Sequence, residues 1–362
     1  MTTTLLPMPR VRERTAAVAA RGNSWPQPLA DAHGRIATDL RVSVTDRCNL
    51  RCTYCMPPEG LDWLPQSALL SEEEVLRLVG VGVRLLGIKT VRLTGGEPLL
   101  RRDLERLVAG IARLSPRPTI ALTSNGIGLA ARAADLAAAG LDRINISLDT
   151  LDPATFKQLA RRAKLTEVLA GVAAAKQAGL EPVKINAVLM RGINDHEAYG
   201  LLRWAMQEQV QLRFIEQMPL DAQHAWQRSE MITAEDIRRL LGEHVVLTED
   251  PVEAATRGSA PAELFRVYLD GLDTGYAVGI IAAVTKPFCG ACDRVRLTAD
   301  GQLRNCLFAM SESDLRTPMR AGASDSELAD IWVANVAGKW PGHGIDDPSF
   351  LQPDRPMSAI GG

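Results

Sequence analysis

The chain has 362 residues, 46% of them hydrophobic and 23% charged, with a formal net charge of -2. This is the composition of a globular protein long enough for a large domain and a smaller one. The near-neutral charge gives no sign of a nucleic-acid partner, and no apolar run reaches the ~20 residues that a membrane helix needs.

Residues 1–33 are expected to form a flexible N-terminal extension. The opening MTTTLLPMPRVRERTAAVAARG lacks the apolar segment of a secretory signal. It contains arginine and no acidic residue before Glu13, so it weakly resembles a transit peptide, but a disordered tail is the simpler interpretation. We therefore expect a reducing, cytoplasmic compartment, where disulfides rarely persist.

All six cysteines fall into two groups of three. Cys48, Cys52 and Cys55 are spaced C-x3-C-x2-C, whereas Cys289, Cys292 and Cys306 are spaced C-x2-C-x13-C. Clustered thiolates select zinc or iron–sulfur clusters, and no histidine follows either group at zinc-finger spacing. Three thiolates would leave one iron of a cubane cluster open to a small molecule. Six unrelated buried cysteines, or one zinc shared by both groups, are the alternatives.

From Leu40 onward, strand-like segments alternate with helical ones. The first predicted helix begins at Ser71, where SEEE resembles a capping box. The predicted strands are residues 40–45, 89–96, 118–126, 143–150, 182–190 and 210–218. Crossovers of this length imply parallel pairing. We predict a partial (β/α)6 barrel of the TIM-like type over residues 34–240, although an open doubly wound sheet would give the same pattern.

One face of the predicted strands is polar, whereas buried parallel strands are usually apolar throughout. Arg41, Arg92 and Lys184 occupy this face. If helices cover the apolar face, these cations line the barrel, where they suit a polyphosphate. The turns TGGEP (94–98) and TSNG (123–126) follow two strands, at the barrel end where such enzymes build their sites. No P-loop sequence occurs.

A C-terminal region over residues 241–340 carries the second cysteine group. Within it, LTADGQL predicts a β-hairpin that turns at Asp300 and Gly301 and returns Cys306 to the side of Cys292. Residues 251–262 read as a loop-like insertion. The Pro/Gly-rich tail, residues 341–362, is expected from its composition to be disordered.

CNLRCTYC followed by TGGEP resembles the radical SAM superfamily, in which three cysteines hold a [4Fe-4S] cluster whose open iron chelates S-adenosylmethionine. Between about Gly34 and Phe308 the chain also resembles the GTP 3',8-cyclase family of molybdenum cofactor biosynthesis. The segments that carry this likeness are GRIATDLRVSVTDRCNLRCTYCMP, VRLTGGEPLLRRDL, RINISLDTLDP, RGINDHE, FIEQMP and FCGACDRVRLTADGQLRNCLF. The likeness is missing from residues 251–262, and the family often has Asn where this chain has Asp293.

The resemblance assigns roles to individual residues. It implies two [4Fe-4S] clusters, one on each cysteine group. It implies S-adenosylmethionine contacts from Tyr54, Gly96, Ser147 and Met218, and GTP contacts from Arg41, Arg92, Thr123, Lys184, Arg294 and Arg296. The chain ends in Gly361 and Gly362, which match a family ending that reaches the active site. Arg294, Arg296, Gly361 and Gly362 are therefore the implied catalytic residues.

The implied reaction is the cyclisation of GTP to 3',8-cyclo-7,8-dihydro-GTP, the first step of molybdenum cofactor biosynthesis. A 5'-deoxyadenosyl radical takes hydrogen from C3', and the resulting carbon radical attacks C8. The resemblance also implies an electron donor, a homodimer, and a functional link to cyclic pyranopterin monophosphate synthase.

Two alternatives stay open. A peptide-modifying radical SAM enzyme would share the first cysteine group but generally has more cysteines. A non-catalytic zinc or iron–sulfur module would not hold about eight iron and eight sulfide per chain, the content of two cubane clusters.

Overall fold

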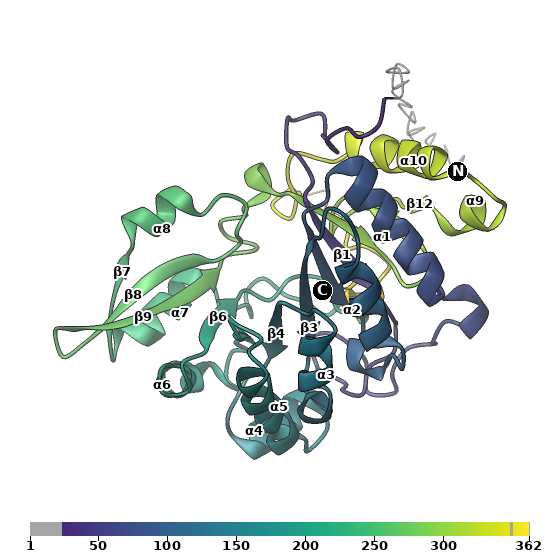
Figure 1. Ribbon diagram of the computed structural model, residues 1–362. Helices are drawn as coiled ribbons and strands as arrows, with labels where there is room; N and C mark the ends of the chain where they lie inside the picture. The colour runs from purple at the N-terminus through teal and green to yellow at the C-terminus, as the bar shows by residue number, and fades with distance from the viewer. Residues whose placement is uncertain (1–23, 348–349, 362) are drawn as a thin grey trace, which may run out of the picture.

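The computed structural model describes residues 24–347 and 350–361, which form an α/β structure around one mostly parallel sheet (Figure 1). The strands are β1 Asp39–Ser43, β2 Thr90–Thr94, β3 Thr119–Ser124, β4 Arg143–Ser147, β5 Lys184–Val188, β6 Gln211–Ile215, β7 Val246–Glu249, β8 Glu263–Leu269, β9 Leu272–Ile281, β10 Arg294–Leu297, β11 Gln302–Arg304 and β12 Ser313–Asp314. Their order in the sheet is β12-β11-β10-β1-β2-β3-β4-β5-β6-β9-β8-β7.

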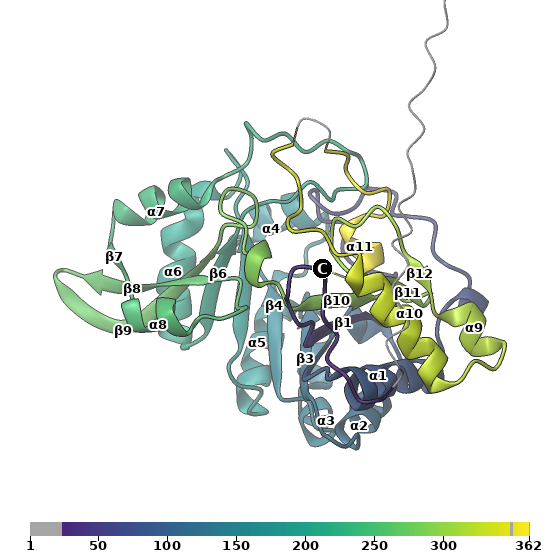
Figure 2. The same cartoon turned by 90° about the horizontal axis from the view of Figure 1, so that it is seen from above.

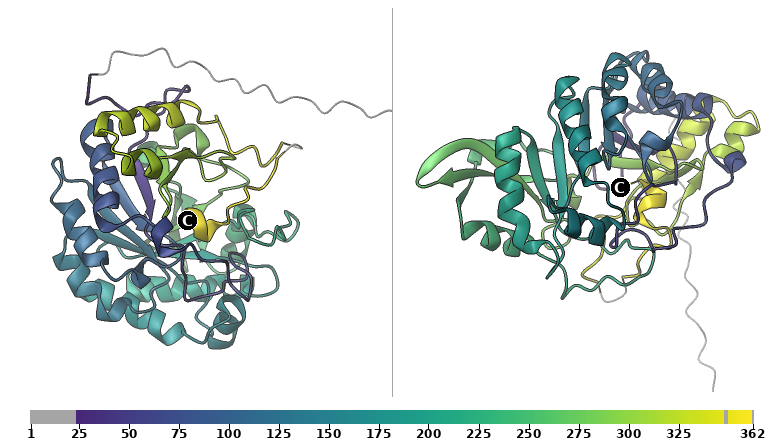
Figure 3. Two further views of the ribbon diagram at one scale, coloured as in Figure 1. Left: turned by 90° about the vertical axis from the view of Figure 1, so that its right-hand side faces the viewer. Right: turned by 90° about the horizontal axis from the view of Figure 1, so that it is seen from below.

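Strands β1 to β6 lie side by side in chain order and are all parallel. Each crossover therefore connects a strand to its immediate neighbour, always in the same direction across the sheet. Because such crossovers are right-handed, the connecting helices all fall on one face. A doubly wound sheet would need a reversal of direction, so the strand order confirms the predicted partial barrel. Helices cover the outside of the curved sheet in Figures 2 and 3.

The helices are α1 Glu72–Leu86, α2 Leu104–Ala112, α3 Ala133–Ala138, α4 Pro153–Ala160, α5 Leu165–Gln177, α6 Ala198–Glu208, α7 Ala234–Gly242, α8 Pro251–Thr256, α9 Arg316–Arg320, α10 Asp325–Ala337 and α11 Met357–Ile360. Alternate strand residues such as Val91, Ile144 and Leu212 are fully buried beneath them. Burying one such side chain contributes about 1.5–3 kcal/mol, so the apolar face fixes the register. Among the described residues, every helix is too short or too polar to span a bilayer.

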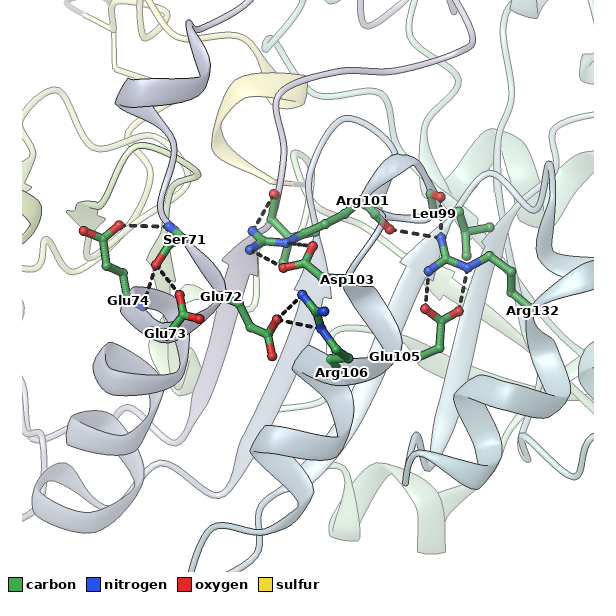
Figure 4. A network of polar contacts seen from close by, with 11 residues as sticks. Ser71, Glu72, Glu73, Glu74, Leu99, Arg101, Asp103, Glu105, Arg106 and Arg132 are labelled. Atoms are coloured by element: carbon green, nitrogen blue, oxygen red, sulfur yellow. Dashed lines mark hydrogen bonds and ion pairs between the residues drawn. The ribbon is translucent and has the colours of Figure 1, made fainter.

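Polar contacts hold the outer helices to the turns at the site end of the strands. Ser71 caps α1 in the predicted capping box with Glu74 (Figure 4). Arg132 binds Glu105 on α2 and also donates to the carbonyl of Leu99 at 2.6 Å. Leu99 belongs to the short 3-10 helix Pro98–Leu100 that follows TGG. The network thus fixes the turn that faces the first cysteine group.

The C-terminal region extends both edges of the barrel sheet. Strand β10 pairs in parallel with β1, and the predicted hairpin joins β10 to β11, with Gly301 at φ +80° in the turn. At the other edge, β9 pairs with β6, and β7 to β9 form an antiparallel arm that projects from the barrel in Figure 1.

Three segments are more ordered than their sequences indicate. Residues 24–33, assigned to the flexible extension, pack on the barrel, because Leu29 is fully buried and the N–H of Gln27 bonds the carbonyl of Leu85. The insertion 251–262 is not wholly loop-like, since Asp250 caps helix α8. The tail forms α11, whose Ile360 is fully buried, so disorder is wrong for that part.

Candidate active site

A cavity of about 590 Å³ lies inside the partial barrel. Its lining includes the first cysteine group and nearly all of the predicted ligand-binding residues: Cys48, Cys52, Cys55, Tyr54, Gly96, Ser147, Met218, Arg41, Arg92, Thr123, Lys184, Arg294 and Arg296. Sequence positions more than 250 residues apart therefore meet around one space.

The first cysteine group occupies the loop after β1. The N–H groups of Cys55 and Met56 both bond the carbonyl of Cys52 at 2.9 Å, which closes a tight turn. The TGGEP turn packs directly on this loop, and the N–H of Gly96 bonds the carbonyl of Thr45 at 2.8 Å. A Cβ on Gly96 would lie 2.3 Å from the carbonyl oxygen of Arg47. The backbones of the TGGEP turn and of the cysteine loop therefore pack too closely for any residue but glycine at this position. A ligand that approaches this backbone would require glycine for the same reason.

Burial raises the pKa of all three thiols of the first group. Burial raises the pKa of Cys52, with Asp149 and Cys55 adding to the effect, and burial raises the pKa of Cys55 to about 12. Thiolates at this place need positive charge that the protein does not supply, and an iron–sulfur cluster would supply it.

No group of three metal-ligating side chains in the described residues could hold a single metal ion. Cys48, Cys52 and Cys55 line one cavity, and in a cubane cluster each cysteine binds a different iron. The residues present therefore fit such a cluster.

Tyr54, between two cysteines of this group, is fixed by a carboxylate. Its hydroxyl donates to Asp149 Oδ2 at 2.6 Å, and Asp149 Oδ1 accepts the N–H of Val188 at 2.9 Å. Burial raises the pKa of Asp149 to about 6 despite both bonds. Asp149 thereby ties the cysteine loop to the ends of β4 and β5.

Cations with unused donors line the middle of the cavity. Arg41 Nε, Arg92 Nε and Nη1, and Arg294 Nε are buried atoms for which the described part of the chain offers no hydrogen-bond partner. Buried donors normally have partners, so these nitrogens are placed for a ligand. Arg92 Nη2 lies 3.9 Å from Asp39 Oδ2, so this carboxylate offsets only part of the positive charge in the cavity.

Two further arginines, Arg143 and Arg213, line the same cavity and received no role from the sequence. Arg213 pairs with Asn186 across β5 and β6, and its Nε and Nη2 are buried without a partner among the described residues. The alternation of polar and apolar residues continues through QLRFI in β6 and places Arg213 on the polar face. The sequence pattern therefore also indicated Arg213 as a cavity residue. Arg143 opens β4 on the same face as Asn145 and Ser147, so strand alternation indicates it as well.

The cations repel one another. Burial, together with Arg213, Arg143 and Arg92, lowers the pKa of Lys184 to about 8. Burial and the neighbouring arginines likewise lower the pKa of Arg213 to about 9 and that of Arg296 to about 10. A polyanion would relieve this repulsion, which indicates the kind of ligand the cavity takes.

The second cysteine group adjoins this cavity. A hollow of about 70 Å³ is lined by Cys289, Cys292 and Cys306, and it shares Met218, Arg294 and Arg296 with the larger cavity. The β10–β11 hairpin brings Cys306 back to Cys292, as the sequence predicts.

The insertion also reaches the site. Arg294 stacks on Phe288, with its guanidinium carbon 4.6 Å from the ring centre, and donates to the carbonyl of Ser259 at 3.0 Å. The Ser259 hydroxyl in turn donates to Asp293 Oδ2 at 2.9 Å, which also accepts from the Thr38 hydroxyl. The insertion, which the Molybdenum Cofactor Synthesis C match over residues 210–345 includes, therefore positions one of the implied GTP ligands.

The tail enters the barrel, and α11 lies within the curve of the sheet in the left view of Figure 3. The carbonyl of Gly361 accepts a hydrogen bond from Arg296. Gly361 has φ +77°, and a Cβ there would lie 2.7 Å from Thr94 Cγ2. The predicted catalytic residue Gly362 lies outside the described residues.

A parallel partial barrel with a cysteine triplet in its first loop, beside a TGGEP turn, defines a radical SAM protein. Residues 42–205 match the Radical SAM superfamily, and residues 210–345 match Molybdenum Cofactor Synthesis C. The Streptococcus suis protein SuiB bound to its precursor peptide SuiA has a similar fold, with a TM-score of 0.56 at 14% identity over 88% of this chain and 68% of that one.

Curated relatives identify the family of radical SAM proteins to which this chain belongs. The GTP 3',8-cyclase of Streptomyces coelicolor is 59% identical over 92% of this chain and 96% of its own length. That of Mycolicibacterium smegmatis is 56% identical over the full length of both chains. The chain belongs to the GTP 3',8-cyclase family. As a radical SAM protein, it uses an iron–sulfur cluster and S-adenosylmethionine.

Proposed function

We propose that this protein cyclises GTP to 3',8-cyclo-7,8-dihydro-GTP in a radical S-adenosylmethionine reaction, the first step of molybdenum cofactor biosynthesis. The observation that carries the proposal is the arrangement of one cavity. The first cysteine group and a set of cations with unused donors line this cavity, and the second cysteine group lines a smaller hollow that adjoins it.

The residues divide into three sets. Cys48, Cys52 and Cys55 hold the first [4Fe-4S] cluster, with Tyr54, Gly96, Ser147 and Met218 around S-adenosylmethionine. When bound, this pair supplies a 5'-deoxyadenosyl radical that removes hydrogen from C3' of GTP. Cys289, Cys292 and Cys306 would hold a second [4Fe-4S] cluster, which would supply an open iron for the guanine.

The protein's own part is to bind and orient GTP. Arg41, Arg92, Lys184 and Arg213 contact the triphosphate, since all four line the cavity and the three arginines have buried donors without a partner among the described residues. Arg294 and Arg296 lie where the two hollows meet and hold the nucleotide between the clusters. Thr123 is a further contact, and its buried hydroxyl lacks a partner among the described residues. Fixing both ends of GTP places C3' beside the radical carbon and keeps water out.

The partners follow from the same assignment. We propose a cytoplasmic homodimer that takes electrons from a reducing partner and passes its product to cyclic pyranopterin monophosphate synthase.

The test is anaerobic incubation of the reconstituted protein with GTP, S-adenosylmethionine and reductant. We expect 3',8-cyclo-7,8-dihydro-GTP by mass spectrometry and about eight iron per chain. The Cys52→Ser variant is the control and should form no product. A protein that binds both clusters yet leaves GTP unchanged while cleaving S-adenosylmethionine would point to another radical SAM reaction.

A further inference from the structure

Lys339 follows α10 and is one of the few buried lysines, with 4% of its surface exposed. Its Nζ donates to the carbonyl of Arg294 at 2.8 Å, to the carbonyl of Cys292 at 3.2 Å and to Cys292 Sγ at 3.5 Å. All three contacts within the described residues go to Cys292 and to Arg294 at the start of β10, and none goes to a carboxylate.

A buried ammonium group without an opposite charge is strongly unfavourable, by several kcal/mol even after relaxation. Two carbonyl dipoles lower this cost but do not cancel the charge. The remaining contact is the Cys292 sulfur, which carries charge only as a thiolate. The site is therefore arranged for an anion at this sulfur.

Lys339 is held rigidly beside that sulfur. Arg35 donates to the carbonyls of Trp340 at 2.6 Å, Pro341 at 3.0 Å and Cys289 at 2.7 Å, so it ties the residues after Lys339 to the cysteine loop. Asp31 pairs with Arg35, and both side chains are buried. Arg35 thus joins the N-terminal segment and the start of the tail to the loop of the second cysteine group.

We propose that Lys339 is a positioning residue that serves as the counter-ion of the cluster on Cys289, Cys292 and Cys306 and makes that cluster easier to reduce. This inference rests on the second cluster of the proposed function. Reduction adds one negative charge to the cluster, and a fixed ammonium group at a ligand sulfur stabilises the reduced form more than the oxidised one. The positive charge of Lys339 and its hydrogen bond to the Cys292 sulfur both favour the reduced cluster.

The test uses the full-length, anaerobically reconstituted protein and three variants. Iron and sulfide are counted, and each cluster is titrated by electron paramagnetic resonance at set potentials. Adding S-adenosylmethionine perturbs the signal of the first cluster and so assigns the two signals. In Lys339→Met we expect the second cluster to shift to a more negative potential, with the first cluster unchanged as internal reference. Lys339→Arg keeps the charge and should stay close to the unmodified protein.

Lys286→Met is the matched control, because Lys286 lies near the same cysteines in sequence but is exposed and paired with Glu263. An unchanged second potential in a Lys339→Met protein with both clusters would overturn the proposal. If Lys339→Met loses the second cluster and Lys339→Arg keeps it, the result supports the need for a positive charge at this position. If both variants lose the cluster, the site requires the shape of lysine and not its charge, and the proposal is overturned. Only about four iron in the unmodified protein would instead refute the second cluster itself.

Discussion

The two cysteine groups contain the same three thiols in very different surroundings. Around the first group the near charges are carboxylates: Asp149 adds to the burial that raises the pKa of Cys52, and Glu97 does the same at Cys48. Arg51 is close as well, but its guanidinium binds the backbone carbonyls of Cys48 and Leu50. Around the second group, Lys339 and Arg294 lower the pKa of Cys292.

The difference indicates a division of labour. The first group, beside carboxylates, favours a cluster that is hard to reduce and therefore strongly reducing, as cleavage of S-adenosylmethionine requires. A cluster on the second group, beside cations, would be easier to reduce. Arg294 and Arg296 line both hollows.

The largest effect is expected from breaking either group separately. Cys52→Ser should abolish cleavage of S-adenosylmethionine, because the first cluster supplies the electron. Cys292→Ser should abolish cyclisation while some uncoupled cleavage continues. Chromatographic measurement of 5'-deoxyadenosine and of cyclised nucleotide separates the two outcomes. If both variants fold and lose both reactions equally, the division of labour is wrong.

The tail joins the two regions, and altering its tip should have the next largest effect. Gly361→Ala places a methyl group 2.7 Å from Thr94 Cγ2 and disfavours φ +77°, so the contact with Arg296 is displaced. We expect cyclisation to fall on the order of 100-fold, the scale of a 1 Å misplacement in an active site. Deleting Gly361 and Gly362 should act similarly.

Gly342→Ala is the control for the tail, since a Cβ at Gly342 meets no atom within 4 Å. Cluster content and melting temperature should stay unchanged in all tail variants. Full cyclisation by the truncated chain would make the tail an inert extension. A short peptide ending in Gly-Gly is expected to restore part of the activity.

Removing a cation between the two groups should weaken GTP binding with little effect on S-adenosylmethionine. Arg92→Ala or Lys184→Ala removes a charge-assisted hydrogen bond, which is worth about 1.5–3 kcal/mol. Calorimetry with each ligand measures both affinities, and the exposed Arg162→Ala is the control. Unchanged GTP affinity in both variants would place the triphosphate elsewhere.

The smallest expected effect is a pH dependence of GTP affinity. The pKa of Lys184 is lowered to about 8, so the ammonium form that binds phosphate is lost as pH rises through 8. Affinity should fall up to about tenfold between pH 7 and 9, and this residue adds no dependence below pH 7. Lys184→Arg stays charged and should remove that part of the slope. The same slope in Lys184→Arg would assign it to another group.

Local patterns in the sequence determined much of the fold. The six strand segments, the capping box at Ser71 and the turn at Asp300 and Gly301 depend on side chains a few residues apart, and all appear as expected. Strand alternation placed Arg41, Arg92 and Lys184 on one face, and the structure brings all three to one cavity. The triplet spacings indicated two cluster sites by the chemistry of thiolates alone.

Only the tertiary structure decided which distant segments complete the site. The pairing of β10 with β1, the arrival of Ser259 at Arg294, the entry of α11 and the contact of Lys339 with Cys292 all join residues far apart in the chain or outside any local pattern. Such contacts depend on how the whole sheet curves and on which edge each later segment packs. Residues 24–33 and the tail look disordered because each can bury little by itself; packed on the rest of the chain, they bury Leu29, Asp31 and Ile360.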